Sequence, residues 1–346
     1  MSNAPSRADA SAAYDALLIV SFGGPERRED VLPFLENVTR GKRVPPARLV
    51  EVAEHYELFG GLSPINGEVR ALLGALVAEL NARGPALSVY WGNRFWHPML
   101  AETIGQMAED GVRRALAFCT SAFGSYPGCR AYSEDIERAR AEVGPEAPPI
   151  DKLRLFYNHP GFIEPQAERV AAALAEVAED RRDRARIVFT AHSLPLALAR
   201  SSPYERQLRE ACRLVAERLP GAPRRWQLAY QSRSGQPDEP WLEPDLRDVL
   251  DELGRSHEAT DVVVVPIGFL CEHMEVAYDL DVEAQAICGE MGLNMVRAGT
   301  VGPHPRLVRM IRELALERIE GAPRAALGDH PPPDDACAAD CCPARP

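Results

Sequence analysis

Short apolar runs alternate with longer amphipathic stretches along most of the chain. The runs typical of β-strands cover residues 14–22, 87–95, 113–123, 152–160, 185–195, 225–235, 261–269 and 293–300. Between them, apolar residues recur every three or four positions, as in residues 67–84 and 204–219, which is the period of an amphipathic helix. Strands that alternate with helices predict an α/β fold with parallel sheets.

The strands divide into two groups of four along the chain. We therefore predict a first domain at residues 14–160 and a second at residues 161–304, and we expect the helix over residues 305–321 to pack back on the first domain. Residues 322–346 are rich in Pro, Ala and Asp, which predicts a tail. Residues 1–13 lack the apolar core of a signal peptide and predict a disordered segment.

The residues that follow the apolar runs are polar or glycine-rich. In open parallel sheets, ligands bind beyond the carboxyl ends of the strands, so these segments are expected to line one cleft. They read "SFGGPE", "GNRFWHP", "TSAFGSYPGC", "YNHPGF", "AHSLP", "QSRSG" and "GFLCEHMEV".

Three carboxylates, Glu275, Asp279 and Glu283, follow the buried strand over residues 261–269 at a spacing of four residues. On an α-helix this spacing places them on one face, about 6 Å apart along the axis. Such a ladder can pass a divalent cation or relay protons. The alternative is a solvated acidic helix face, and the position directly after a buried strand favours function.

His192 lies at the carboxyl end of another buried strand, in "ARIVFTAHSLP". A neutral imidazole can ligate a metal ion or accept a proton near neutral pH. The alternative is a core histidine bonded to a neighbouring carbonyl, and the residue alone does not decide between them. Ser193 next to it is not in a G-x-S-x-G motif, which argues against a hydrolase.

Three of the eight cysteines, Cys337, Cys341 and Cys342, lie in the last ten residues. With Cys129 from the loop "SYPGCRAY" they would make four thiolates, which suit a [2Fe–2S] cluster or a structural zinc ion. The alternative is a tail with incidental cysteines. Side chains of adjacent residues usually diverge, so one of Cys341 and Cys342 could be left out of the ligand set.

Composition narrows the class of protein. The 346 residues carry a formal net charge of −12, which argues against a nucleic-acid partner because phosphate backbones select basic surfaces. No run of eighteen apolar residues is present, so no transmembrane segment is expected, and we expect a cytoplasmic protein.

The motifs at the strand ends together resemble the ferrochelatase family. They are "SFGGPE" (21–26), "FLENVTRG" (34–41), "FGGLSPING" (59–67), "FTAHSLP" (189–195), "QSRSG" (231–235), "WLEPD" (241–245) and "PIGFLCEHMEVAYDLDVEAQ" (266–285). The version here is most similar to actinobacterial-type enzymes. The resemblance implies two Rossmann-like domains, each a mostly parallel four-stranded sheet flanked by helices, with a porphyrin cleft between them.

The resemblance also implies an activity, namely insertion of Fe²⁺ as a substrate into a porphyrin with release of two protons. The family's histidine falls on His192, its partner acid on Glu275, and its acidic relay on Asp279 and Glu283. A tyrosine that some bacterial members carry is Phe22 here, and Phe cannot ligate iron. Some members hold a [2Fe–2S] cluster, which implies Cys129, Cys337, Cys341 and Cys342 as its ligands, although the C-x₃-C-C spacing does not match a standard pattern.

Actinobacterial-type relatives act on coproporphyrin III, and this substrate is favoured over protoporphyrin IX. The segment "NVTRGKRVPPARLVEV" lacks the long hydrophobic lip of protoporphyrin enzymes. A downstream haem-pathway enzyme is an expected partner. Candidate porphyrin contacts, in addition to Phe22, are Arg40, Arg43, His55, Ser63, Asn66, Asn93, Arg94, Ser125 and Tyr132. Alternatives are a cobalt or nickel chelatase, a non-catalytic porphyrin or haem carrier, and a redox sensor that works through the cysteine tail.

Overall fold

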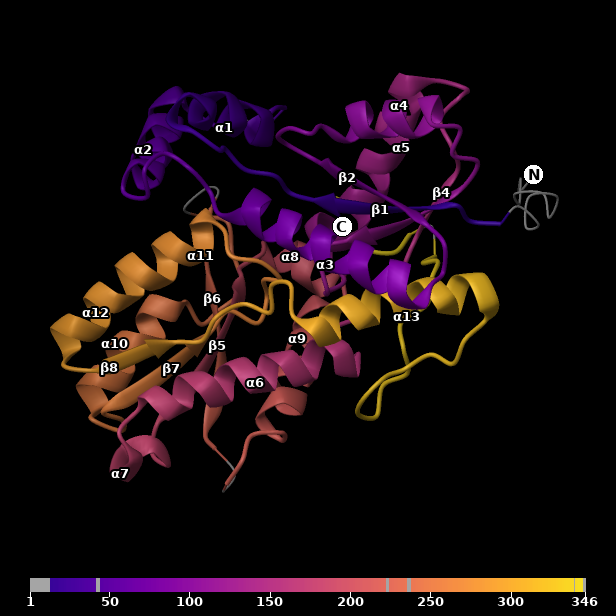
Figure 1. Ribbon diagram of the computed structural model, residues 1–346. Coiled ribbons are helices and arrows are strands. Elements are labelled where there is room, and N and C mark those ends of the chain that lie inside the picture. The colour runs from indigo at the N-terminus through magenta and orange to yellow at the C-terminus, as the bar shows by residue number, and fades with distance from the viewer. Residues whose placement is uncertain (1–12, 42–43, 222–223, 235–237, 339, 345–346) are drawn as a thin grey trace.

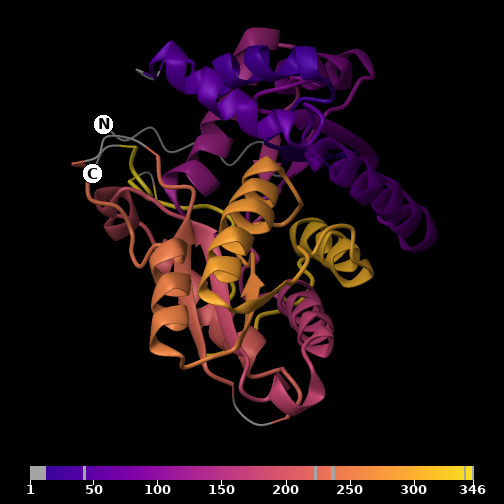
Figure 2. The same cartoon turned by 90° about the vertical axis from the view of Figure 1, so that its left-hand side faces the viewer.

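A computed structural model describes residues 13–41, 44–221, 224–234, 238–338 and 340–344. Most of the predicted disordered N-terminal segment, and Arg43, lie outside these residues. In both views the first half of the chain, coloured indigo to violet, forms one lobe above the second half, coloured magenta to orange (Figures 1 and 2).

Two parallel four-stranded sheets form the framework, which confirms the predicted α/β fold. The first contains β1 (Ala16–Ser21), β2 (Ser88–Asn93), β3 (Ala115–Cys119) and β4 (Ile150–Lys152) in the order β2-β1-β3-β4. The second contains β5 (Arg186–His192), β6 (Trp226–Gln231), β7 (Asp261–Val265) and β8 (Asn294–Arg297) in the order β6-β5-β7-β8. The strand order is therefore repeated, although the sequence shows no repeat of residue identity.

Helices flank both sheets (Figure 1). Those of the first half are α1 (Val31–Thr39), α2 (Pro46–Glu57), α3 (Ile65–Arg83), α4 (Leu100–Glu109) and α5 (Ala131–Val143). Those of the second are α6 (Pro160–Glu176), α7 (Glu179–Arg182), α8 (Leu196–Arg200), α9 (Tyr204–Ala216), α10 (Leu246–Ser256), α11 (Met274–Tyr278) and α12 (Gln285–Met291), followed by α13 (Pro305–Glu320). A 3₁₀ turn, η2 (Arg28–Asp30), and two π-helices, η3 (Tyr126–Arg130) and η4 (Asp279–Ala284), complete the elements.

A single apolar core joins the two sheets. It includes Leu17 and Phe118 of the first sheet and Phe189 and Val263 of the second, all fully or almost fully buried. Helix α13 packs against α3 of the first half and against α6 of the second. The two halves therefore share their hydrophobic stabilisation, which grows with the apolar area removed from water.

The fourth strand begins earlier than the apolar run that predicted it. Strand β4 ends at Lys152, and the chain then leaves the sheet. Phe156 stacks on Phe118 of β3, with ring centroids 5.1 Å apart, and Tyr157 is buried nearby. The run over residues 152–160 is apolar because it enters the core between the sheets, which periodicity alone does not separate from a buried strand.

The segment after α13 is held against the body of the protein by hydrogen bonds. Leu327 N donates to Asn158 O at 2.8 Å, and Asn158 Nδ2 donates to His330 O at 3.1 Å. Arg154 Nη2 donates to Ala325 O at 2.9 Å. These contacts place the first part of the predicted tail against Arg154 and Asn158, which follow β4 in the chain.

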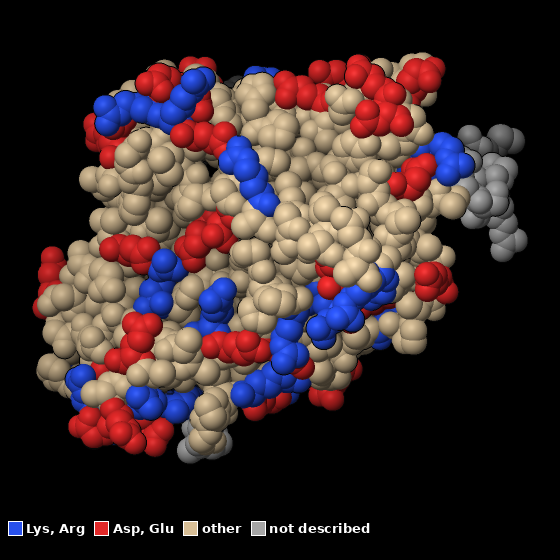
Figure 3. Space-filling view, viewed as in Figure 1, with Lys and Arg blue, Asp and Glu red and all other residues tan. Residues whose placement is uncertain are grey.

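Acidic and basic side chains are interspersed on the face shown in Figure 3, with no broad field of one sign there. Within the described ranges, no helix has both the length and the apolar character needed to cross a membrane.

Candidate active site

The site forms where the chain order reverses in the second sheet. Strands β5 and β7 are neighbours there, and β5 ends with His192. After β7 the chain turns and enters α11, which carries Glu275. His192 Nε2 lies 4.0 Å from Glu275 Oε2. Ligands bind at such switch points in open parallel sheets, so the two side chains stand where a substrate is expected.

A glycine allows the chain after β7 to pass close to β5. Gly268 N donates to Thr190 O at 3.0 Å. A Cβ atom at position 268 would lie 2.6 Å from the Cβ of Ala191, which is closer than two carbon atoms can approach. Because Ala191 precedes His192, this contact fixes the distance between the histidine and the segment that leads to Glu275.

The backbone determines which nitrogen of His192 carries a proton. Nδ1 faces the carbonyl oxygen of Ser193, and a carbonyl can only accept a hydrogen bond. Nδ1 is therefore the protonated nitrogen of the neutral ring, and Nε2 presents a lone pair towards Glu275. The hydroxyl of Tyr204 donates to the carbonyl oxygen of His192 at 3.0 Å and holds the backbone there.

Asp279 lies one helical turn beyond Glu275 and is half-buried. Its carboxylate accepts hydrogen bonds from Gln231 Nε2 at 3.1 Å and from Ser232 Oγ. Burial is the main cause that raises its pKa from 3.8 to about 6, and the charge of Glu275 adds to this rise. Asp279 can therefore gain and lose a proton close to neutral pH. Ser232 has a φ of +59°, a conformation that costs energy for a residue with a side chain.

The spacing predicted that the three carboxylates lie on one continuous α-helix, and the structure differs from this prediction. Helix α11 ends at Tyr278 and continues as the π-helix η4, whose wider turns form by bonds from residue i to residue i+5. Each carboxylate has a different neighbour. Glu275 faces His192, Asp279 is held by the β6 loop, and Glu283 accepts a bond from Arg247 Nη2 at 2.8 Å.

A largely aromatic cluster, most of it from the first half, adjoins the carboxylates. Its members come from the loop after β1, from α1 and α2, from the loop after β2 and from α11. They include Phe22, Phe34, Tyr56, Phe95, Trp96, Met274 and Tyr278. Phe22 and Phe95 have ring centroids 4.6 Å apart. Burial raises the pKa of Tyr56, and the charge of Glu275 contributes, so Glu275 lies near this cluster.

Two predicted porphyrin contacts lie at this cluster. Phe22 is half-buried within it. His55 stacks on Tyr278 of α11, with centroids 3.6 Å apart and planes inclined by 5°. The pair joins α2 of the first half to α11 of the second, and burial lowers the pKa of His55. Arg40 is exposed at the end of α1 and donates to Asn37 Oδ1 at 2.6 Å.

The other predicted porphyrin contacts are buried and have partners inside the protein. Asn93 is fully buried, and its Oδ1 accepts from Trp91 Nε1 at 2.9 Å. Ser125 caps the π-helix η3, accepting from Gly128 N at 3.0 Å. Tyr132 lies under the guanidinium of Arg94, 4.3 Å from its ring centroid. Ser63, Asn66 and Arg94 are likewise buried or half-buried. Any effect of these residues on the site would come from positioning the side chains and loops next to them.

The four predicted cluster cysteines line one hollow of about 370 Å³. The neighbouring thiol of Cys129 lowers the pKa of Cys337. The sulfur atoms of Cys341 and Cys342 are 3.5 Å apart, so these neighbours do not diverge. Cys342 achieves this with a φ of +50°. In the described residues, however, no three His, Cys, Asp or Glu side chains stand in an arrangement that holds a metal ion.

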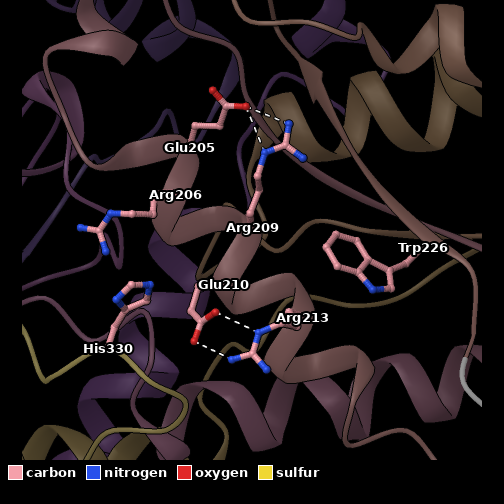
Figure 4. Close-up of a pocket in the computed structure, with 7 residues that line it drawn as sticks. All are labelled: Glu205, Arg206, Arg209, Glu210, Arg213, Trp226 and His330. Atoms are coloured by element: carbon pink, nitrogen blue, oxygen red, sulfur yellow. Dashed lines mark hydrogen bonds and ion pairs between the residues drawn. The ribbon is translucent and has the colours of Figure 1, made fainter.

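A larger hollow of about 560 Å³ lies on the exposed side of α9 (Figure 4). Two of its three arginines, Arg209 and Arg213, pair with carboxylates of the same helix. Arg209 Nη2 bonds to Glu205 at 2.8 Å, and Arg213 Nη2 bonds to Glu210 at 2.8 Å. The pairing leaves these two guanidinium groups poorly suited to an anionic ligand.

Two parallel four-stranded sheets in this order make up a fold that solved chelatase structures share. The cobalt complex of the sirohydrochlorin chelatase SirB from Bacillus subtilis subspecies spizizenii shares the fold, with a TM-score of 0.53. The match covers 89% of this chain and 96% of that chain at 14% sequence identity.

Sequence comparison identifies the particular family. The model of the ferrochelatase family matches residues 14–319, and the chain belongs to this family. The coproporphyrin III ferrochelatase of Frankia alni is 53% identical over 95% of this chain and 87% of the relative. The ferrochelatase of Rhodopirellula baltica is 49% identical over 95% of this chain and 93% of the relative. The resemblance that the motifs indicated is confirmed, and the protein is an enzyme, a lyase.

Sequence reasoning missed several residues that support the site. Gln231 and Ser232 lie in the quoted motif "QSRSG", but nothing in the sequence paired them with Asp279. Tyr204 opens a helix and looks like an ordinary core residue. Lys152, which donates to Cys129 Sγ at 2.8 Å, gave no signal in the sequence.

Proposed function

We propose that this ferrochelatase inserts Fe²⁺ into coproporphyrin III to give Fe-coproporphyrin III (coproheme) and two protons. The observation that carries the mechanism is the position of His192 Nε2, which lies 4.0 Å from Glu275 while Nδ1 bonds to the Ser193 carbonyl. An aromatic cluster adjoins Glu275. The substrate is supported by relatives from Frankia alni and Nocardia farcinica, which are named coproporphyrin III ferrochelatases and are 53% and 52% identical to this chain.

His192 acts as the base. A porphyrin must lose two pyrrole protons while the cation enters the ring, and Nε2 has the lone pair to accept one of them. The Nδ1 bond to Ser193 O stays in place during this transfer, because both ring nitrogens of an imidazolium are donors. Glu275 then stabilises the positive charge that forms on His192, since opposite charges attract at this distance.

The carboxylates bind the incoming Fe²⁺ and take up the released protons. Fe²⁺ as substrate is bound well by carboxylate oxygens, and Glu275 offers one next to the reacting nitrogen. Asp279 takes up protons, because its pKa of about 6 lets it exchange them near neutral pH. Glu283, paired with Arg247, forms the outer end of the path.

The aromatic cluster receives the porphyrin ring. Phe22, Phe95 and Trp96 are partly exposed, and a flat macrocycle can stack on such side chains. The stacked pair of His55 and Tyr278 borders this surface and joins the two halves. Arg40 has an exposed guanidinium that suits a propionate of the substrate.

We also propose that Cys129, Cys337, Cys341 and Cys342 hold a [2Fe–2S] cluster. The chemistry of the donor set fits, since four thiols line one hollow and two of them have sulfur atoms 3.5 Å apart. When bound, the cluster would supply a one-electron redox centre and a covalent link between η3 and the C-terminal segment. No step of iron insertion runs through it.

The experiment mixes the protein anaerobically with Fe²⁺ and either coproporphyrin III or protoporphyrin IX, and follows loss of the free-base visible bands. Faster turnover of coproporphyrin III is expected. Faster turnover of protoporphyrin IX would make the protein a protoporphyrin IX ferrochelatase and contradict the proposed substrate. Tight binding of a porphyrin without turnover of either would favour a carrier.

The His192→Ala variant tests the mechanism in the same assay. We expect turnover to fall by about 10²–10⁴-fold, which is the usual contribution of a positioned base, while porphyrin binding survives. His257→Asn is the matched control, since His257 is exposed at the end of α10 with a φ of +53° that Asn tolerates. Near-normal turnover of His192→Ala would contradict the role given to this residue.

A further inference from the structure

A lysine contacts the sulfur of the buried cysteine in the thiol hollow. Lys152 is the last residue of β4 and is half-buried. Its Nζ donates to Cys129 Sγ at 2.8 Å and to Cys129 O at 3.1 Å. No ion pair joins Lys152 to a carboxylate in the part of the chain that the structure describes. Removing an ammonium group from water is costly unless a negative partner lies close by.

The acidic residues around the hollow already have cationic partners. Glu134 accepts from Arg130 Nε at 3.0 Å. Asp335 pairs with Arg324 and with Arg318, the latter at 3.3 Å. The atom that faces Lys152 is instead the sulfur of Cys129, which becomes a full negative charge when it binds a metal.

We propose that Lys152 is a positioning residue of the cysteine site: it supplies the counter-charge to the thiolate of Cys129 and so sets the reduction potential of the cluster. This inference rests on the [2Fe–2S] cluster put forward under Proposed function. Four thiolates, two ferric ions and two sulfide ions carry a net charge of −2, and the reduced cluster carries −3. A cation 2.8 Å from a ligand sulfur stabilises the reduced form more than the oxidised form.

The position of Lys152 in the fold supports this role. It ends the short edge strand β4, and the chain beyond it enters the core, where Asn158 binds the C-terminal segment through Leu327 and His330. The same stretch of chain therefore supplies the cation and anchors the segment that carries three of the thiols. Arg130 contributes a further contact to this segment, from Nη1 to Cys341 O at 2.9 Å.

The test compares the complete chain with Lys152→Met, Lys152→Arg and Arg255→Met. Lys152→Met removes the charge but keeps an unbranched side chain, and Lys152→Arg keeps the charge. Arg255→Met is the control, because it removes a cation from the exposed end of α10, where Arg255 pairs with Asp251. Each protein is purified anaerobically and analysed for iron and acid-labile sulfide, visible absorption, electron paramagnetic resonance after reduction with dithionite, and midpoint potential against redox mediators.

We expect the midpoint potential to shift to more negative values in Lys152→Met, with little change in Lys152→Arg and in the control. Cluster loss in Lys152→Met with retention in Lys152→Arg would support the same conclusion, since it shows that the charge is needed. Equal potentials in Lys152→Met and wild type would overturn the role of Lys152 but not the cluster itself. Loss of the cluster from both Lys152→Met and Lys152→Arg, with both variants folded, would also overturn that role. Wild-type protein without iron or sulfide would overturn the cluster, and this inference with it, whereas iron insertion into porphyrin would be unaffected.

Discussion

Replacing Asp279 with Asn should make the folded protein more stable at neutral pH while slowing iron insertion. Burial holds the pKa of this carboxyl at about 6, against an ordinary value of 3.8. Since a tenfold change in proton affinity corresponds to about 1.4 kcal/mol, ionised Asp279 destabilises the folded state by about 3 kcal/mol at pH 7. Asn keeps a carbonyl oxygen for Ser232 or Gln231, so we expect a gain of about 1–3 kcal/mol in the free energy of unfolding.

The gain should depend on pH with a definite sign. Between pH 3.8 and 6 the folded protein binds more protons at Asp279 than the unfolded chain does, so wild-type stability falls as the pH rises through this interval. The difference between Asp279→Asn and wild type should thus be smallest near pH 4 and reach its full size above pH 6. Urea unfolding at pH 4.5, 6 and 7.5 measures it.

The control for this experiment is Asp248→Asn on α10. Asp248 is exposed, and surface substitutions of this kind usually change stability by less than about 0.5 kcal/mol. An Asp279→Asn protein that is no more stable than wild type at pH 7.5 would refute the argument from burial. Unchanged turnover, in turn, would contradict the relay role given to Asp279.

Two further substitutions test the framework of the site. Glu317→Gln should lower the free energy of unfolding by about 3–5 kcal/mol, because it leaves the buried guanidinium of Arg154 without its counter-charge. In the wild-type protein this guanidinium bonds to Glu317 at 2.6 and 2.8 Å. An unchanged urea midpoint would contradict this prediction. Gly268→Ala should cost about 1–3 kcal/mol and reduce turnover by displacing Ala191 next to His192. Gly289→Ala, which meets no atom within 4 Å and lies inside α12, should lower neither stability nor turnover. Equal turnover in both variants would refute the packing argument.

The strands could be predicted because their signal is local. The runs that became β1, β5 and β7 are continuous and apolar, and each is buried along nearly its whole length. Strand β4 was misplaced, since its three residues are only half-buried and the apolar residues after it serve the core instead. A short edge strand gives little periodicity, so its position depends on pairing with β3, which the sequence does not display.

The parts of the candidate site that could be predicted are those in which the residue type by itself indicates the chemistry. The parts that were missed are those in which a contact depends on the three-dimensional arrangement. A histidine at the end of the buried strand β5 and a carboxylate after the buried strand β7 are visible in the sequence, and the structure places them 4.0 Å apart. The bond between Ser232 and Asp279 joins residues 47 positions apart. Lys152 is one of many polar residues until folding places it against Cys129. Contacts of this kind depend on tertiary packing, which no local pattern encodes.

The repeated strand order connects the active site to the cysteine site. Strand β3 of the first sheet occupies the position that β7 occupies in the second. A π-helix is the next element after β3, and another follows β7 after the short helix α11. The first π-helix, η3, carries Cys129, and the second, η4, begins with Asp279. π-Helices are rare and occur mostly at functional sites, because their wider turns re-aim side chains. Each half therefore carries a π-helix on the carboxyl side of corresponding strands: η4 begins with the carboxylate for which we propose a role in iron insertion, and η3 carries the thiol that contacts Lys152.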